Sequence, residues 1–277
     1  MGIVQKAFQK LRANGDSIGM PRAYARPTTA ADTDASARRI DIDKNALRLA
    51  GLMPEASVER RFAAHFRQIK RPLLSRAMNT GSAATMEHRV IAVTSALPGD
   101  GKTFTSFNLA MSMASERDLS VLLVDGDVAS PLISRTIGAA ADPGLMEALQ
   151  NEAVDAESLV LATSVPGLAV LPAGRPDQNA TELLASRRMF EIVQRLLVAD
   201  PGRIMLIDSP PLLISTEARA LIAIAGQVVL VARADVTLRQ AMLDALALIG
   251  SDKCAGLVLN ESRSGTEAGS YGYGNDE

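Results

Sequence analysis

Short apolar runs and amphipathic segments alternate along the chain from residue 90 onward. The runs are rich in β-branched residues and predict buried strands, whereas the amphipathic segments carry apolar residues at helical spacing. After a first strand that begins near Val90, we expect strands at 121–124, 168–172, 204–207, 228–232 and 256–259. We expect helices at 104–116, 144–150, 181–198, 215–225 and 237–249. This order, with short turns between the elements, predicts an α/β fold: a doubly wound, mostly parallel sheet with helices on both faces.

The region before residue 90 lacks this alternation. Residues 1–12 have apolar and basic positions at helical spacing, which predicts a short amphipathic helix suited to docking on a partner or a membrane surface. Residues 13–40 have no period and indicate a flexible linker, and residues 56–71 predict a basic helix that Pro72 stops. We therefore expect three parts: a basic arm at 1–82, an α/β domain at 86–262 and a mobile tail at 263–277.

The charge is divided unevenly along the chain. It has 277 residues, 47% of them hydrophobic, and a net charge of −2. Residues 1–89 contain 16 Lys and Arg against 8 Asp and Glu, whereas residues 90–277 contain 13 against 23. A basic arm thus precedes an acidic domain. Such an arm can meet anionic lipid, nucleic acid or an acidic protein surface, or it can simply be solvated, and composition does not choose among these.

Composition also disfavours several classes of protein. No apolar run approaches the roughly 20 residues that cross a bilayer, and the N-terminus lacks a signal-peptide pattern, so we expect a cytoplasmic protein. Cys254 is the only cysteine, which rules out a disulfide or a cysteine-based metal cluster within one chain. With two histidines in the sequence, a zinc enzyme is also disfavoured.

The first predicted strand runs into a glycine-rich turn that ends in Gly-Lys-Thr. Residues 96–103 follow the pattern G-x-x-x-x-G-K-[ST], except that Ala96 replaces the first glycine, while Pro98-Gly99 supplies a turn of its own. In such a phosphate-binding loop, or P-loop, backbone N–H groups surround a polyphosphate, the lysine reaches the β- and γ-phosphates, and the final hydroxyl binds Mg²⁺. The expected nucleotide contacts are Pro98, Gly99, Asp100, Gly101, Lys102, Thr103 and Phe104.

Carboxylates follow two further predicted strands. Asp125 and Asp127 come after the strand at 121–124, and Asp208 follows the strand at 204–207. The carboxyl ends of parallel strands line one crevice, so these side chains can converge with Lys102 on one Mg²⁺-nucleotide. Taken alone, Asp125 and Asp127 fit a solvated turn equally well, but the presence of Lys102 and Asp208 favours a nucleotide site.

Two of the three tyrosines lie in the last seven residues. Tyr271 and Tyr273 are flanked by Gly and Ser in a tail without a core-forming pattern, whereas Tyr24 lies in the N-terminal arm. A tyrosine in a mobile tail can enter the active site of another molecule. Chance and solubility are the alternative explanation, but beside a nucleotide site the tail suggests a phosphoryl acceptor.

Taken together, these motifs resemble the bacterial tyrosine kinases, which are built on a P-loop NTPase fold. The matching elements are Walker A at 95–103, Walker A′ at 121–127, Walker B at 204–211 and the C-terminal tyrosine cluster. Shorter segments look like those of the exosortase-associated tyrosine autokinases of exopolysaccharide gene clusters. They are residues 66–74, 171–174, 181–184, 257–260 and the opening helix.

The resemblance implies a role for each matching position in the nucleotide site. Lys102 would contact the phosphates of ATP, and Thr103 would bind the Mg²⁺ ion. Asp127 and Asp208 would hold that ion directly or through water. Asp125 would act as the base or orient the incoming tyrosine hydroxyl. The resemblance also places Asn260 where the family contacts the nucleotide base.

The resemblance further implies an acceptor and partners. The acceptor would be Tyr271 or Tyr273 of a neighbouring chain, which makes the protein an ATP-dependent tyrosine autokinase acting in trans. It would regulate exopolysaccharide synthesis or export with a membrane-anchored chain-length-determinant protein, a polysaccharide co-polymerase. The kinase would then lie in the cytoplasm, peripheral at the inner membrane through that partner. A homo-oligomer fits this scheme, whereas nucleic acid and a metal cluster do not.

The chain departs from the family pattern in three ways, one of which is a short tyrosine cluster with two members, which limits graded phosphorylation at several sites. The oligomer-forming helix of the family reads Glu-x-x-Arg-x-x-Arg, whereas the same frame here reads Ala64, Arg67 and Lys70, which weakens the case for ring assembly. The loop after Walker A′ usually carries an arginine near its proline, but this chain has Ala129-Ser130 there. A missing cation at that point would slow phosphoryl transfer or change what completes the site.

Two other functions fit parts of the sequence. A partitioning ATPase of the Min/Par type shares the fold, but its signature lysine in Lys-Gly-Gly-x-Gly-Lys-Thr is absent, because Leu97-Pro98 occupies the Lys-Gly positions. A nucleotide-bound regulatory module without tyrosine transfer is the second alternative, and the altered positions at Ala64 and Ala129 are compatible with it.

Overall fold

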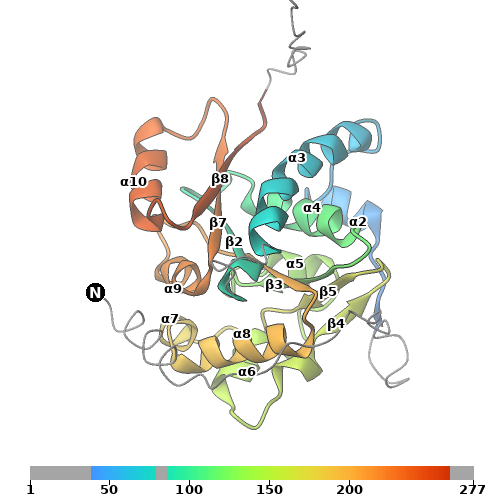
Figure 1. Cartoon of the computed structure of the whole chain (residues 1–277), viewed down its shortest axis with the longest axis vertical. Coiled ribbons are helices and arrows are strands. Elements are labelled where there is room, and N and C mark those ends of the chain that lie inside the picture. The colour runs from blue at the N-terminus through green and yellow to red at the C-terminus, as the bar shows by residue number, and fades with distance from the viewer. Residues whose placement is uncertain (1–38, 79–85, 263–277) are drawn as a thin grey trace, which may run out of the picture. The chain divides into compact units, whose positions relative to one another are not determined.

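A computed structural model describes residues 39–78 and 86–262. Within these residues an eight-stranded sheet has the order β1-β4-β5-β3-β6-β2-β7-β8 (Figure 1). The strands are β1 (Arg39–Ile40), β2 (Val90–Ser95), β3 (Ser120–Asp125), β4 (Leu161–Thr163), β5 (Leu168–Leu171), β6 (Arg203–Asp208), β7 (Gln227–Arg233) and β8 (Cys254–Asn260). All neighbouring pairs are parallel except β4 and β5. The predicted doubly wound, mostly parallel sheet is confirmed.

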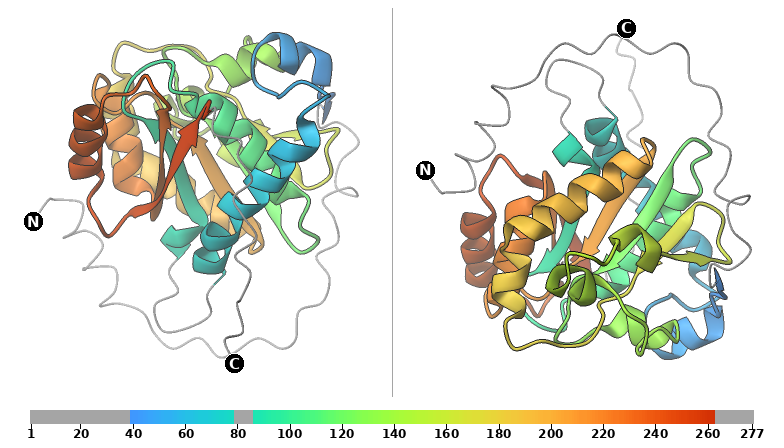
Figure 2. Two further views of the ribbon diagram at one scale, coloured as in Figure 1. Left: turned by 90° about the horizontal axis from the view of Figure 1, so that it is seen from above. Right: turned by 90° about the horizontal axis from the view of Figure 1, so that it is seen from below.

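Helices cover both faces of this sheet, as the two views of Figure 2 show. One face carries α2 (Lys44–Leu49), α3 (Glu59–Ala77), α4 (Lys102–Ala114) and α5 (Leu132–Thr136). The other carries α6 (Leu145–Gln150), α7 (Ala180–Leu184), α8 (Arg187–Ala199), α9 (Thr216–Ile224) and α10 (Arg239–Ile249). Two 3₁₀ turns, η1 (Met86–Arg89) and η2 (Ala156–Leu159), complete these layers. Successive residues of β2 and β3 alternate between the two cores, which explains their continuously apolar sequence.

Part of the expected basic arm belongs to the α/β core. Ile40 in β1, Leu47 in α2 and Phe66 in α3 are buried in the same cluster as Ile91 of β2. The arm expected at 1–82 and the linker expected at 13–40 therefore end earlier, because apolar residues from position 40 onward pack on the sheet. The helix expected at 1–12 lies outside the described residues.

Helix α3 runs through Pro72, so the expected end at residue 71 is wrong. Pro72 has no N–H group and leaves the carbonyl of Gln68 without its usual helical partner. Both residues are exposed, so water can pair with that carbonyl. Leu73, directly after the proline, and Ala77, about one turn later, are buried against the core. Burial of these two side chains stabilises the last turn beyond the proline.

The other differences concern short elements. The helix expected at 181–198 is two helices, α7 and α8, because the Ser186 hydroxyl accepts a hydrogen bond from the N–H of Met189 and caps α8. The sequence pattern did not predict four short elements, each of six residues or fewer: β1, α2, β4 and α5. Among the described residues, no helix is long and apolar enough to cross a membrane.

Candidate nucleotide site

The P-loop joins the end of β2 to the start of α4. Gly99 and Gly101 have φ values of 84° and 94°, in the left-handed region that favours glycine. Helix α4 begins at Lys102, so the expected lysine and Thr103 lie in its first turn, where free N–H groups favour anions. The segment thus has the backbone of a phosphate-binding loop although Ala96 replaces the first glycine.

Three strand-end carboxylates surround Lys102. Its Nζ lies 2.6 Å from Oδ2 of Asp127 and 3.9 Å from Oδ2 of Asp208. It also lies 3.2 Å from the hydroxyl of Thr103. Burial opposes the positive charge, but the attraction of Asp208, Asp127 and Asp125 is stronger and raises the pKa of Lys102. The sequence prediction that these strand ends converge on the P-loop lysine is therefore realised in the fold.

Asp125 and Asp208 are direct neighbours across β3 and β6, and both are fully buried. Burial, with the adjacent Asp208 charge, raises the pKa of Asp125 to about 7 even though Ser134 donates two hydrogen bonds to it. Burial also raises the pKa of Asp208, against the opposing effect of Lys102 and of a hydrogen bond from Ser106 at 2.8 Å. Two adjacent buried carboxylates make this site able to hold protons or cations near neutral pH.

Two carboxylate oxygens of the site have hydrogen-bonding capacity that the protein does not use. Within the described residues, Oδ1 of Asp125 and Oδ2 of Asp208 are buried and accept no hydrogen bond. Three carboxylates face one lysine, so a divalent cation would reduce the excess negative charge. Yet no three His, Cys, Asp or Glu side chains of the described residues form a metal site by themselves. The arrangement fits Mg²⁺, which proteins bind through one or two carboxylates together with phosphate oxygens and water.

Asn260, at the end of β8, lies against the P-loop. Its Nδ2 donates to the backbone oxygen of Asp100 at 3.1 Å. A Cβ on Gly101 would come within 1.9 Å of the same Nδ2, so the two elements touch. Asn260 thus lies beside the nucleotide loop and contacts its backbone. The contact with the nucleotide base that the resemblance implies stays a prediction.

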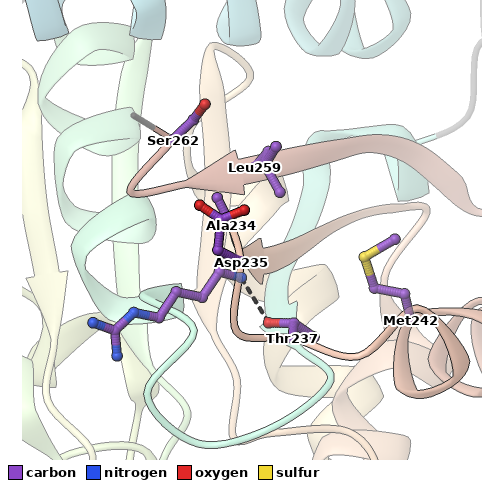
Figure 3. Close-up of a pocket in the computed structure, with 7 residues that line it drawn as sticks. Ala234, Asp235, Thr237, Met242, Leu259 and Ser262 are labelled. Carbon is purple, nitrogen blue, oxygen red and sulfur yellow. Dashed lines mark hydrogen bonds between the residues drawn. The ribbon is translucent and has the colours of Figure 1, made fainter. Parts of the chain in front are cut away.

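A pocket of about 310 Å³ opens at the ends of β7 and β8 (Figure 3). It is lined by Arg233, Ala234, Asp235, Thr237, Met242, Leu259 and Ser262. Thr237 connects this pocket to the P-loop, because its hydroxyl donates to Oδ1 of Asp100 at 2.6 Å. The pocket combines apolar side chains with polar ones next to the predicted phosphate site, and the sequence reading had not included it.

The structure therefore brings together the predicted P-loop residues, the three aspartates and Asn260. Pro98 is exposed and Phe104 half-buried, and Phe104 packs edge-on against Phe62 of α3 at 5.7 Å between ring centroids. Tyr271 and Tyr273 lie outside the described residues. Sequence reasoning missed Ser106, Ser134 and Thr237. Ser106 follows Lys102 by one helical turn and could have been found by that spacing, whereas Ser134 and Thr237 carry no local signal.

Comparison with known proteins first defines the class. A family model described as an AAA domain matches residues 88–246, which contain the P-loop and all three aspartates. The tyrosine-protein kinase CpsD of Streptococcus agalactiae is 30% identical over 196 residues, which are 68% of this chain and 82% of that protein. The tyrosine-protein kinase ptk of Acinetobacter johnsonii is 29% identical over 134 residues, but the match covers 48% of this chain and 18% of that longer protein.

Solved structures agree with this class. The kinase domain of the Escherichia coli tyrosine kinase ETK superposes with a TM-score of 0.64 at 25% identity, over 76% of this chain and 80% of that one. The cell-division ATPase MinD of Pyrococcus furiosus shares the fold with a TM-score of 0.51 at 24% identity, over 62% and 71%. The chain belongs to the bacterial tyrosine-protein kinases with a P-loop fold, and the partitioning-ATPase alternative is not favoured.

Proposed function

We propose that the chain is an ATP-dependent protein-tyrosine autokinase that phosphorylates Tyr271 and Tyr273 of a neighbouring copy. The observation that carries this proposal is the convergence of Lys102, Asp125 and Asp127 at the P-loop. Because the chain belongs to the tyrosine-protein kinases, tyrosine is the acceptor that we propose.

In this proposal the residues of the site divide the work of phosphoryl transfer. The oxygen of the tyrosine forms a bond to the γ-phosphorus, the bond to the β-γ bridging oxygen breaks, and ADP leaves. Lys102 holds the phosphate oxygens and offsets their charge. A tyrosine hydroxyl with a pKa of about 10 keeps its proton at neutral pH. Asp125, whose pKa is raised to about 7, is suited to receive that proton at its unpartnered Oδ1.

Thr103, Asp127 and Asp208 are the residues that would hold Mg²⁺. When bound, the ion neutralises charge on the β- and γ-phosphates. Asp127 is now paired with Lys102, so nucleotide binding would redistribute that ion pair: Lys102 turns to the phosphates, and the carboxylate becomes available for the cation. Ser106 would keep Asp208 in place meanwhile, through its hydrogen bond to Oδ1.

The pocket at the ends of β7 and β8 would receive the nucleoside. Like the P-loop, the pocket lies at the carboxyl ends of the strands. Thr237 and Asn260 connect the two, because both donate hydrogen bonds to Asp100 of the loop. Met242 and Leu259 offer apolar surface to a base, and Asp235 and Ser262 offer polar groups to a ribose. These side chains would complement the phosphate contacts from residues 98–104.

We further propose that the kinase acts on exopolysaccharide synthesis or export through a membrane-anchored chain-length-determinant partner, as the resemblance implies. This would place it in the cytoplasm at the inner membrane.

Transfer in trans needs contact between copies of the chain, and the contacts of Lys70 bear on whether α3 can mediate it. Lys70 of α3 is buried and bonded within its own chain, to Ser112 at 2.6 Å and Glu116 at 2.7 Å. It is therefore not free to bind a neighbouring copy, which agrees with weak assembly through this helix.

Phosphopeptide mass spectrometry tests the proposal. The purified chain would be incubated with Mg²⁺-ATP, with and without the cytoplasmic segment of the partner, beside a Lys102→Ala variant. The proposal expects phosphate on Tyr271 or Tyr273 that is absent from the variant, with Tyr24 as the internal reference. ATP hydrolysis with all tyrosines unmodified would contradict it and favour an ATPase switch. ADP binding without hydrolysis or transfer would identify a regulatory module.

A further inference from the structure

Asp100 is the P-loop residue that hydrogen bonds from other parts of the protein hold in place. It lies between two glycines with positive φ, Gly99 and Gly101, and is almost fully buried, with 2% of its surface exposed. Its Oδ2 accepts a hydrogen bond from the N–H of Leu97 at 3.1 Å, which closes the turn of the loop on itself. The two glycines give the loop additional accessible conformations, so a contact that selects one of them lowers the entropic cost of binding a ligand.

Two side chains from distant elements hold the same residue. The hydroxyl of Thr237, in the loop between β7 and α10, donates to Oδ1 of Asp100 at 2.6 Å. Nδ2 of Asn260 donates to the backbone oxygen of Asp100 at 3.1 Å. Thr237 is itself fixed, because its hydroxyl accepts from the N–H of Arg233 at 2.7 Å, the bond drawn in Figure 3. We refer to Asp100, Thr237 and Asn260 as the Asp100 cluster.

The cluster also resolves an electrostatic difficulty. A carboxylate in a loop that binds phosphates repels its ligand unless its oxygens are engaged elsewhere. Both carboxylate oxygens of Asp100 accept hydrogen bonds from protein groups, one from the loop and one from Thr237. These hydrogen bonds stabilise the negative charge of Asp100 and turn its oxygens toward protein donors, which reduces its repulsion of a bound phosphate.

Backbone strain marks the same region. In the described part of the chain, Asp235 and Glu261 are the non-glycine residues with positive φ, at 61° and 55°. Asp235 lies two residues after the end of β7 and two before Thr237, and Glu261 comes directly after Asn260, the last residue of β8. Such conformations persist only where surrounding contacts hold them, and they gather at functional sites.

We infer that Thr237 and Asn260 are positioning residues for the nucleotide: they hold Asp100 and so preset the P-loop for polyphosphate. The inference rests on the proposed nucleotide site, but it does not require tyrosine transfer. In this role Thr237 and Asn260 affect binding of the phosphate end of the ligand, whereas residues that contact the base or the ribose would affect binding of the nucleoside end.

Binding of two probes separates these roles. Calorimetric titration with Mg²⁺-ADP and with Mg²⁺-pyrophosphate, which has no nucleoside, would compare the full chain with Thr237→Val and Asn260→Ala variants. Loss of a hydrogen bond to a charged group should weaken binding roughly tenfold for Thr237→Val. The inference expects the same fold loss for ADP and for pyrophosphate in each variant. A loss confined to ADP would overturn it and assign these residues to the nucleoside.

Matched variants complete the test. Thr237→Ser keeps the hydroxyl and should bind both probes as the unmodified chain does. Thr181→Val removes a hydroxyl hydrogen bond of similar length, to Thr216 at 2.9 Å. That bond joins α7 to the start of α9 and includes no residue of the P-loop or the Asp100 cluster, so the variant should change neither affinity. In an Asp100→Ala background, Thr237→Val should cause no further loss. An equal loss in Thr237→Ser and Thr237→Val, or full additivity with Asp100→Ala, would overturn the inference. Nucleotide binding with no phosphotyrosine would instead contradict the proposed function alone.

Discussion

The ammonium group of Lys102 lies 2.6 Å from Oδ2 of Asp127, and both side chains are largely buried. The pair joins the first turn of α4 to the end of β3, at the carboxyl edge of the sheet. In the proposed mechanism both partners have a second task, since Lys102 must reach phosphate and Asp127 must hold Mg²⁺. The ion pair between Lys102 and Asp127 and the contacts proposed for the nucleotide complex therefore compete for the same two groups.

This competition predicts a metal-dependent effect of Asp127→Asn. The substitution removes a cation ligand but frees Lys102, so ADP affinity should fall roughly tenfold in Mg²⁺ and stay level or rise in EDTA. Titration calorimetry in the two buffers measures this. Asp177→Asn, which alters a half-buried carboxylate that accepts a hydrogen bond from Gln150, serves as the control and should change neither value. Equal losses with and without Mg²⁺ would show that Asp127 has no specific task toward the cation.

A second prediction concerns pH and stability. The pKa of Asp125 is about 7 in the folded chain and near 4 when the chain unfolds. The folded state then binds the proton more tightly, so the free energy of unfolding should fall as pH rises from about 4 to about 7. The fall from this one group is on the order of 3 kcal/mol. Asp208, with a raised pKa, contributes in the same direction.

Urea denaturation in EDTA at pH 5, 6, 7 and 8 measures this slope. Asp125→Asn keeps an oxygen to accept from Ser134 and removes the charge, so it should flatten the curve and exceed the unmodified chain in stability at pH 8. A stability curve that rises from pH 5 to pH 7, or one that Asp125→Asn leaves unchanged, would contradict the assigned environment of Asp125.

The sequence predicted which strand ends meet at the P-loop better than it predicted where the α/β domain begins. Lys102, Asp125 and Asp208 each follow a strongly apolar strand, and parallel pairing brings such strand ends together whatever lies between them. The position of α3 depends instead on Leu73 and Ala77 meeting a surface formed by distant residues. The same is true of Ser134 and Thr237, whose bonds to Asp125 and Asp100 span 9 and 137 residues. Local patterns carry no information about such contacts.

The inclusion of α2 and α3 in the core predicts how truncation acts. A chain that begins at residue 39 should melt within a few degrees of the full chain. A chain that begins at residue 79 loses Leu47, Phe66 and Leu73, which are buried, and should unfold or aggregate. Circular dichroism melting and light scattering measure both. Equal stability of the two truncated chains would contradict the packing of α3. Tests of partner binding through the N-terminus should accordingly remove residues 1–38.

Arg135 supplies a cation to the loop that lacks the arginine expected near its proline. Its Nη2 donates to the hydroxyl of Ser130 at 3.3 Å, and the N–H of Ser130 donates to Asp127. In the proposed mechanism, Arg135→Gln should therefore slow autophosphorylation roughly tenfold at saturating ATP, because the loop that contacts Asp127 through Ser130 loses its cation. Arg187→Gln, on the exposed side of α8, is the matched control and should leave the rate unchanged. Unchanged transfer in Arg135→Gln would exclude this arginine from the reaction.

A mixing experiment tests the central claim, tyrosine transfer between copies, most directly. One chain carries Lys102→Ala with its tail intact, and the other carries Tyr271→Phe and Tyr273→Phe with its site intact. Each would be incubated alone with Mg²⁺-ATP and the partner segment, then both together, and the tails would be analysed by mass spectrometry. The account predicts phosphate on Tyr271 or Tyr273 of the Lys102→Ala chain in the mixture only. Tails without phosphate in the mixture, under conditions where the chain without substitutions hydrolyses ATP, would contradict tyrosine transfer between copies.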